Sequence, residues 1–164
     1  MINIRITIIL EGLFSITMIV GSVMTLVPIV DVLYNNPVSL SFLWIGLLIA
    51  LASYTAYFAI SKIVKRIETT YIEAFTTYSL TWLVVPALSA IPLSIETGVS
   101  YIDALFESIS GFTGTGLTIY QGLDYTKKGI LFWRGLMQWM GELGVVIVLI
   151  GFMLYRRLIQ LITI

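Results

Sequence analysis

The chain has 164 residues, of which 59% are hydrophobic and 11% are charged, and its formal net charge is +0. With a mean hydropathy of +1.01 it is too apolar for a water-soluble domain of this size and is predicted to be an integral membrane protein. The few charges are scattered, which excludes a nucleic-acid-binding surface. Without cysteine or histidine, the sequence also excludes thiol chemistry, disulfides, Ser/His triads and histidine metal sites.

Four long apolar runs follow one another along the chain, and each is long enough to cross the hydrocarbon core of a bilayer. We therefore predict four membrane spans, at Ile6–Val30, Leu40–Ile60, Ala74–Ile95 and Ile130–Tyr155. The first run is too long for the apolar region of a signal peptide and has no small-residue cleavage pattern, so we interpret it as a span.

Basic residues near the span ends indicate the orientation, because cytoplasmic loops of membrane proteins are enriched in Lys and Arg. Most of them fall on the side that we expect to be cytoplasmic, namely Arg5, Lys62, Lys65, Arg66, Arg156 and Arg157. The opposite side carries Lys127, Lys128 and the interfacial Arg134. We expect a multi-pass protein of the cell (plasma) membrane with both termini in the cytoplasm.

A segment too short to cross the membrane lies between the third and fourth spans. Ser100 and Asp103 form a capping-box pattern that begins a helix, and Gly111 is expected to end it in a left-handed conformation. A helix of that length measures roughly 15 Å, half of what a bilayer core requires. The segment is therefore predicted to enter the membrane from outside and return.

The loop after this helix carries Thr113, Gly114, Thr115 and Gly116. A Thr/Gly-rich loop alone is most often a turn, and this one lacks the Lys-Ser/Thr of a phosphate-binding loop. Here it follows the negative end of a half-length helix, and its backbone carbonyls can replace part of an ion's hydration shell. Its position between two spans therefore favours a selectivity filter.

Two sequence motifs resemble those of a known family. The segment Phe106–Thr118 (F-E-S-I-S-G-F-T-G-T-G-L-T) resembles the first filter region of the Trk/Ktr/HKT potassium uptake proteins, where F-E-S-x-S-G-x-T-T-T-G is usual. Phe132–Leu149 is similar to the family's following helix, which typically contains R-x-x-x-Q-W-x-G-G-x-G. The resemblance implies an all-α membrane protein with two N-terminal spans in residues 1–68. Residues 69–164 would form a pore unit of span, re-entrant pore helix, filter loop and span.

The resemblance also implies roles for individual residues. Potassium would bind only at the carbonyls of residues 113–116, with Ser110, Gly111 and Arg134 supporting the filter and Arg134 tying the following helix to the loop. In plant relatives, glycine at the position of Gly116 goes with potassium preference and serine with sodium preference.

Two acidic residues lie within predicted spans, where ionisable groups are functional candidates. Glu142 stands where the resembled family usually has glycine, and we regard it as a candidate intramembrane acidic site. It either faces the pore or is protonated and hydrogen-bonded to a neighbouring helix. Glu11 is expected to form a structural ion pair with the basic loop that carries Lys62, Lys65 and Arg66.

The sequence thus predicts a transmembrane subunit of a monovalent cation uptake system, with potassium as the transported ion, no cofactor in this chain and no enzymatic activity. A filter normally needs four converging loops, and this chain has one. We expect it to be part of a split or truncated transporter, with a homotetramer as the second arrangement and a non-conducting assembly or regulatory subunit as the alternative function. Expected partners are membrane lipid, further pore-unit subunits and, by resemblance, a cytosolic nucleotide-binding regulatory subunit.

Overall fold

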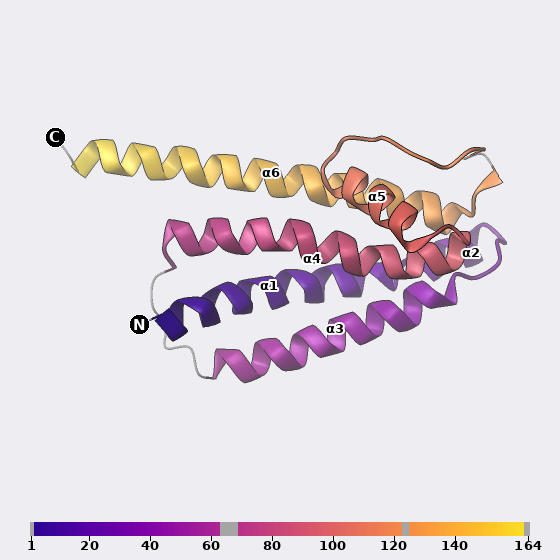
Figure 1. The fold of residues 1–164 in the computed structure, drawn as a ribbon, viewed down its shortest axis with the longest axis horizontal. Coiled ribbons are helices and arrows are strands. Elements are labelled where there is room, and N and C mark those ends of the chain that lie inside the picture. Colours follow the sequence, from indigo (N-terminus) through magenta and orange to yellow (C-terminus); the bar gives the residue numbers. More distant parts are fainter. Residues whose placement is uncertain (1, 63–68, 123–124, 163–164) are drawn as a thin grey trace.

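The computed structural model describes residues 2–62, 69–122 and 125–162. These residues form six α-helices joined by loops: α1 (Ile2–Met24), α2 (Val27–Leu33), α3 (Leu40–Ser61), α4 (Tyr71–Thr97), α5 (Tyr101–Phe112) and α6 (Lys128–Ile162). Figure 1 shows α1, α3, α4 and α6 running lengthwise through the molecule, with the start of α1 and the end of α6 at the same end. The short helices α2 and α5 lie toward the other end.

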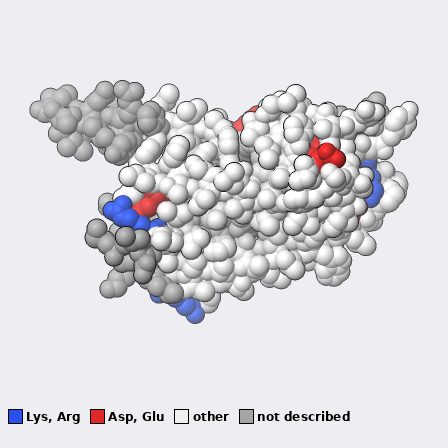
Figure 2. Space-filling view, viewed as in Figure 1, with Lys and Arg blue, Asp and Glu red and all other residues white. Residues whose placement is uncertain are grey.

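The four predicted spans are confirmed as helical segments long and apolar enough to cross a membrane, with shifted boundaries. The observed segments are Arg5–Leu33, Leu40–Ser61, Tyr71–Thr97 and Lys128–Gly151. On the face drawn in Figure 2, Lys and Arg side chains lie toward the two ends of the molecule, and the broad middle between them shows none. This distribution is the one that a bilayer-spanning protein requires.

The first span differs from the prediction because it is broken rather than continuous. α1 ends at Met24, and Pro28 lies in the first turn of the separate helix α2. Proline has no N–H with which to continue the bonding of α1, whereas it is well tolerated in the first turn of a new helix. The chain therefore turns at Thr25 and Leu26, whose N–H groups donate to carbonyls three residues earlier.

Glycine allows α1 and α3 to cross at close range. A Cβ atom on Gly21 would lie 2.9 Å from the Gly46 carbonyl oxygen, and a Cβ atom on Gly46 would lie 2.8 Å from the Gly21 carbonyl oxygen. The buried hydroxyls of Thr17 and Ser53 are hydrogen-bonded at 2.9 Å on the same pair of helices. Small residues and interhelical hydroxyl bonds are typical of helix packing inside membranes, where no hydrophobic driving force acts between helices.

The apolar core is centred on Trp133 of α6, which is fully buried. Its ring contacts Phe42 of α3 edge-on, with centroids 5.7 Å apart, and Phe112 at the end of α5, with centroids 6.4 Å apart. One aromatic side chain therefore connects the N-terminal helices, the short helix α5 and the last span.

Candidate functional site

The candidate site is built on α5, the short helix between the last two long ones. α5 begins where the sequence predicts: Ser100 is its N-cap, the Ser100 hydroxyl accepts a hydrogen bond from the Asp103 N–H at 3.1 Å, and it donates to the Asp103 carboxylate at 2.8 Å. The helix has 12 residues, a length of about 18 Å. It is therefore too short to cross a bilayer core of about 30 Å.

The end of α5 corrects the prediction for Gly111. Gly111 remains within the helix, which continues to Phe112, and it does not adopt a left-handed conformation. A Cβ atom on Gly111 would lie 2.9 Å from the Met137 Cβ, so glycine is needed here for the close approach of α6. The left-handed residue is Gly114, with φ = 68°.

The segment Thr113–Thr118, which we call the Thr/Gly loop, leaves α5 with a defined backbone path. The N–H of Gly114 donates to the Gly111 carbonyl at 2.9 Å, and the N–H of Thr115 donates to the Ser110 carbonyl at 3.0 Å. Gly116, with φ = 72°, is a second left-handed position. L-residues other than glycine rarely adopt such angles, so the two glycines set the shape of the loop.

Side chains of α5 and of the loop itself brace this path. The Ser110 hydroxyl donates to the Leu117 carbonyl at 2.7 Å, which ties the far end of the loop back to the helix. The hydroxyls of Thr113 and Thr115 are hydrogen-bonded to each other at 2.6 Å. All six residues of the loop are solvent-exposed in the isolated chain. The loop therefore has an open side.

Glu107 is the polar centre beneath the loop, with a relative exposure of 1%. Its Oε1 atom accepts hydrogen bonds from the Thr118 hydroxyl and the Ile119 N–H, both at 2.6 Å. Its Oε2 atom forms an ion pair with Arg134 of α6 at 3.0 Å, and the Arg134 guanidinium lies 5.5 Å from the centre of the Tyr120 ring. Arg134 is thus linked to the Thr/Gly loop through Glu107. Burial raises the pKa of the Tyr120 phenol, so this side chain stays neutral beside the ion pair.

Three polar residues of α6, spaced four apart, lie alongside the Thr/Gly loop. Arg134 pairs with Glu107, which binds the end of the loop and Ile119 just after it. Gln138 lies next to Gly116, and Glu142 lies next to Gly114. A Cβ atom on Gly116 would lie 3.7 Å from Gln138 Nε2, and one on Gly114 would lie 3.6 Å from Glu142 Oε1. The sequence analysis gave Gln138 no role, although it belongs to the resembled R-x-x-x-Q-W motif. Its spacing from Arg134 and Glu142 places all three on one helix face.

Gly141 allows α6 to meet the end of α5. A Cβ atom at this position would collide with the Phe112 carbonyl oxygen. Gly141 is buried, whereas the adjacent Glu142 is exposed. The backbone of α6 is therefore packed directly against the last carbonyl of α5.

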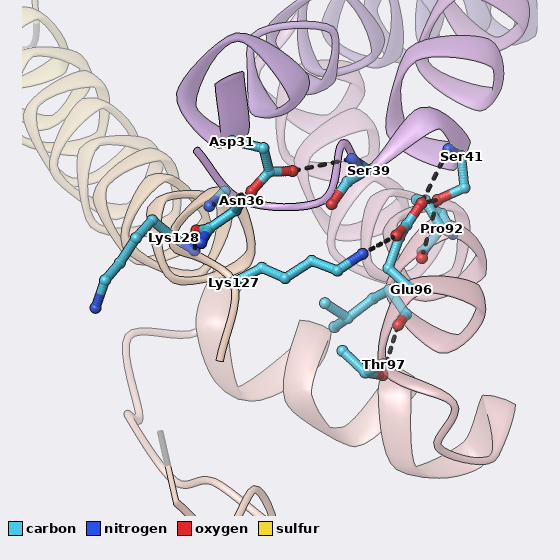
Figure 3. A network of polar contacts seen from close by, with 11 residues as sticks. Asp31, Asn36, Ser39, Ser41, Pro92, Glu96, Thr97, Lys127 and Lys128 are labelled. Carbon is cyan, nitrogen blue, oxygen red and sulfur yellow. Dashed lines mark hydrogen bonds and ion pairs between the residues drawn. The ribbon is translucent and has the colours of Figure 1, made fainter. Parts of the chain in front are cut away.

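A polar network at the end of the molecule that contains α2 holds the start of α6 (Figure 3). Asp31 of α2 is completely buried, and its carboxylate accepts hydrogen bonds from the N–H groups of Ser39 at 3.0 Å and Gly129 at 2.8 Å. The Asn36 side chain accepts a hydrogen bond from the Lys128 N–H at 2.8 Å. These contacts cap the free N–H groups of α6 and place negative charge at its positive end.

A second part of this network joins α4 to the chain after the Thr/Gly loop. Glu96 forms an ion pair with Lys127 at 2.8 Å and accepts hydrogen bonds from the N–H and hydroxyl of Ser41 at 3.0 and 2.6 Å. Figure 3 shows Glu96 between Ser41 and Lys127. Sequence reasoning did not single out Asp31 or Glu96. Their only signal was a carboxylate near the end of an apolar run.

The expected pairing of Glu11 stays a prediction. Lys65 and Arg66 lie outside the described residues, and the Lys62 ammonium lies 4.2 Å from the centre of the Phe58 ring. Near the same end of the molecule, Arg5 pairs with Glu73 at 3.8 Å.

In the parts of the chain that the structure describes, no cluster of three or more His, Cys, Asp or Glu side chains is arranged to hold a metal ion. The backbone carbonyls of the Thr/Gly loop remain the candidate ion ligands.

The fold and site define the class of protein: a multi-pass, all-helical membrane protein with a half-length helix and a glycine loop before its last span. The chain belongs to the TrkH family, since residues 42–160 match the family model described as "Cation transport protein". Members of this family are transporters rather than enzymes.

Individual relatives agree with this assignment. The chain is 36% identical to an uncharacterised cation transporter of Methanocaldococcus jannaschii over 85% of its length and 29% of the relative's. It is 29% identical to the Trk system potassium uptake protein TrkH of Vibrio parahaemolyticus over 90% of its length and 29% of the relative's. The crystal structure of the potassium transporter TrkH from that organism superposes with a TM-score of 0.68 at 29% identity, covering 91% of this chain and 31% of the other. The chain thus spans under a third of the length of these relatives.

Proposed function

We propose that this chain is a transmembrane component of a potassium uptake system and that its Thr/Gly loop supplies one segment of the selectivity filter. The observation that carries the proposal is the pair of left-handed glycines, Gly114 and Gly116, placed directly after the half-length helix α5. In this reading α5 is the pore helix, and its negative end faces the ion path. The loop carbonyls replace part of the hydration shell of the ion.

The bracing of the loop supports this proposal. A filter must hold its carbonyls at fixed positions although the loop has little apolar contact of its own. Ser110 fixes the Leu117 carbonyl, and Glu107 fixes the N–H of Ile119 and the hydroxyl of Thr118. The buried pair of Glu107 and Arg134 links this bracing to α6. A simple surface turn has no need of such an arrangement.

The proposal requires partners, because one loop cannot surround an ion. We propose that further pore units, from a split partner or from other copies of this chain, complete the filter. Relatives of which the aligned part of this chain covers only 29% favour the split or truncated arrangement. A cytosolic nucleotide-binding regulatory subunit remains an expectation from the resemblance.

The orientation is also part of the proposal, with both termini in the cytoplasm and the Thr/Gly loop entering from outside. Arg5 and Lys62 lie at the proposed cytoplasmic ends of α1 and α3, and Lys127 and Lys128 lie at the start of α6. Reporter fusions in the 61–68 link and at each terminus test this directly. A reporter in that link that is accessible from outside the cell would refute the orientation.

The experiment for the filter compares Gly116→Ser with Gly122→Ser. Both glycines are left-handed, with φ of 72° and 69°, so a side chain at either position carries a similar backbone strain of about 1–2 kcal/mol. Gly116 lies in the Thr/Gly loop and Gly122 beyond it. We expect Gly116→Ser to reduce potassium uptake roughly tenfold or to shift preference toward sodium, and Gly122→Ser to change either much less.

The assay is growth of a potassium-uptake-deficient host on limiting potassium, together with rubidium and sodium flux, with partner pore units co-expressed. Equal effects of the two substitutions would indicate backbone strain alone. If Gly116→Ser left flux and ion preference unchanged in a conducting assembly, the loop would not be a filter.

A further inference from the structure

Glu142 has a position that the filter proposal does not explain. Its side chain is exposed, and its Cγ and Oε1 atoms lie 3.4 and 3.6 Å from where a Cβ on Gly114 would be. Among the described residues, its carboxylate has neither a hydrogen bond nor a salt bridge. The carboxylate therefore stands next to the first left-handed residue of the Thr/Gly loop without a protein partner.

Two negative features of the backbone lie close to Glu142. The last carbonyl of α5, that of Phe112, is packed against the adjacent Gly141, and the negative end of the α5 dipole ends at the same place. The basic residue nearest along α6 is Arg134, two turns away and already paired with Glu107. No described basic side chain is paired with Glu142. The ionised form of this carboxylate would therefore need a partner other than the described side chains.

The position of Glu142 along α6 makes a partner for its carboxylate important. Glu142 lies thirteen positions after Gly129, which is at the start of α6, and this corresponds to about 20 Å along the helix. Glu142 therefore lies within the candidate membrane span Lys128–Gly151 rather than at its start, and a hydrocarbon core is about 30 Å thick. An ionised carboxylate at such a depth is costly unless it is paired or faces water.

We propose that the Glu142 carboxylate binds a monovalent cation at the Gly114 end of the Thr/Gly loop, together with carbonyl oxygens of the loop and of the end of α5. The inference rests on the proposed function, since it assigns an additional ion site to the same pathway. Oxygen ligands suit a hard cation, and a single carboxylate favours a monovalent ion, because divalent sites usually combine several charged ligands. The site lies one helical turn beyond Gln138, which faces Gly116.

The test uses Glu142→Gln and Glu142→Asp in the full chain with any partner subunits that co-purify. The first readout is the rubidium concentration at half-maximal flux, and the second is the thermal stabilisation of the purified protein by rubidium chloride relative to choline chloride. We expect Glu142→Gln to raise the half-saturating concentration about tenfold and to lose most of the rubidium-dependent stabilisation. Glu142→Asp keeps the charge and should retain much of both.

Glu73→Gln is the matched control, since it makes the same chemical change in the first turn of α4, whereas α5 follows the last turn of α4. Its capping box with Thr70 tolerates glutamine, and rubidium affinity should not change. Unchanged rubidium affinity and stabilisation in Glu142→Gln would overturn the inference and leave a neutral, structural side chain. If Gly116→Ser alters flux while Glu142→Gln does not, the filter proposal survives and the Glu142 site fails. If the assembly conducts nothing but rubidium still stabilises it through Glu142, the site survives and the transport proposal fails.

Discussion

Replacing Arg134 with methionine tests whether the buried ion pair holds the Thr/Gly loop in place. The Glu107 side chain has 0% exposure and Arg134 has 14%, so the guanidinium is the charge that compensates a fully buried carboxylate. Removing one partner of a buried pair leaves an uncompensated charge and typically costs about 3–5 kcal/mol. We expect Arg134→Met to lower the free energy of unfolding by that amount, a change of over roughly 100-fold in the folded-to-unfolded ratio.

The control for this prediction is Arg5→Met. Arg5 is 51% exposed and lies 3.8 Å from Glu73, so its pairing should contribute less than about 1 kcal/mol. Adding Glu107→Gln to Arg134→Met should restore part of the stability, because the amide oxygen still accepts the bonds from Thr118 and Ile119 but the buried charge is gone. The measurement is denaturant or thermal unfolding in detergent or nanodiscs. The reasoning fails if Arg134→Met is as stable as Arg5→Met, or if the double variant is less stable than Arg134→Met alone.

Two further predictions concern contacts that α6 makes with the rest of the chain. Gly141→Ala should destabilise by about 1–3 kcal/mol, because the new methyl group collides with the Phe112 carbonyl. Gly135→Ala on the same helix meets nothing within 4 Å and should be neutral or stabilising by up to about 1 kcal/mol, so equal unfolding midpoints for the two variants would contradict the close approach. Asp31→Asn should cost about 1–3 kcal/mol, because an amide supplies only one acceptor for two buried N–H groups, including that of Gly129. Hydrogen exchange at the first turn of α6 should rise in that variant, and unchanged protection there would contradict the capping role.

The spans and the start of α5 could be predicted from the sequence because their determinants are local. An apolar run such as Leu40–Ser61 needs no tertiary information to be recognised as a span. The Ser100 cap likewise acts within one helical turn. The break between α1 and α2 was also local, and Pro28 was its signal.

The contacts that give the site its shape could not be predicted in this way. Gly111 and Gly114 are equally able to adopt left-handed angles, and the choice between them depends on Met137, which packs against Gly111 from another helix. The bond from the Gly129 N–H to Asp31 joins residues 98 positions apart. A sequence pattern shows that a carboxylate is present but not which distant N–H it will accept from.

The register between α6 and the Thr/Gly loop is marked by two contacts. Gln138 lies next to Gly116 and Glu142 lies next to Gly114. Polar side chains one helical turn apart on α6 therefore meet glycines two residues apart in the loop. Since Asp31 caps the first turn of α6 and Arg134 pairs with Glu107 further along, the same helix connects the N-terminal region to the loop. A rotation or shift of α6 would therefore move the charge of Glu142 relative to the loop carbonyls and disturb the cap at its first turn at the same time.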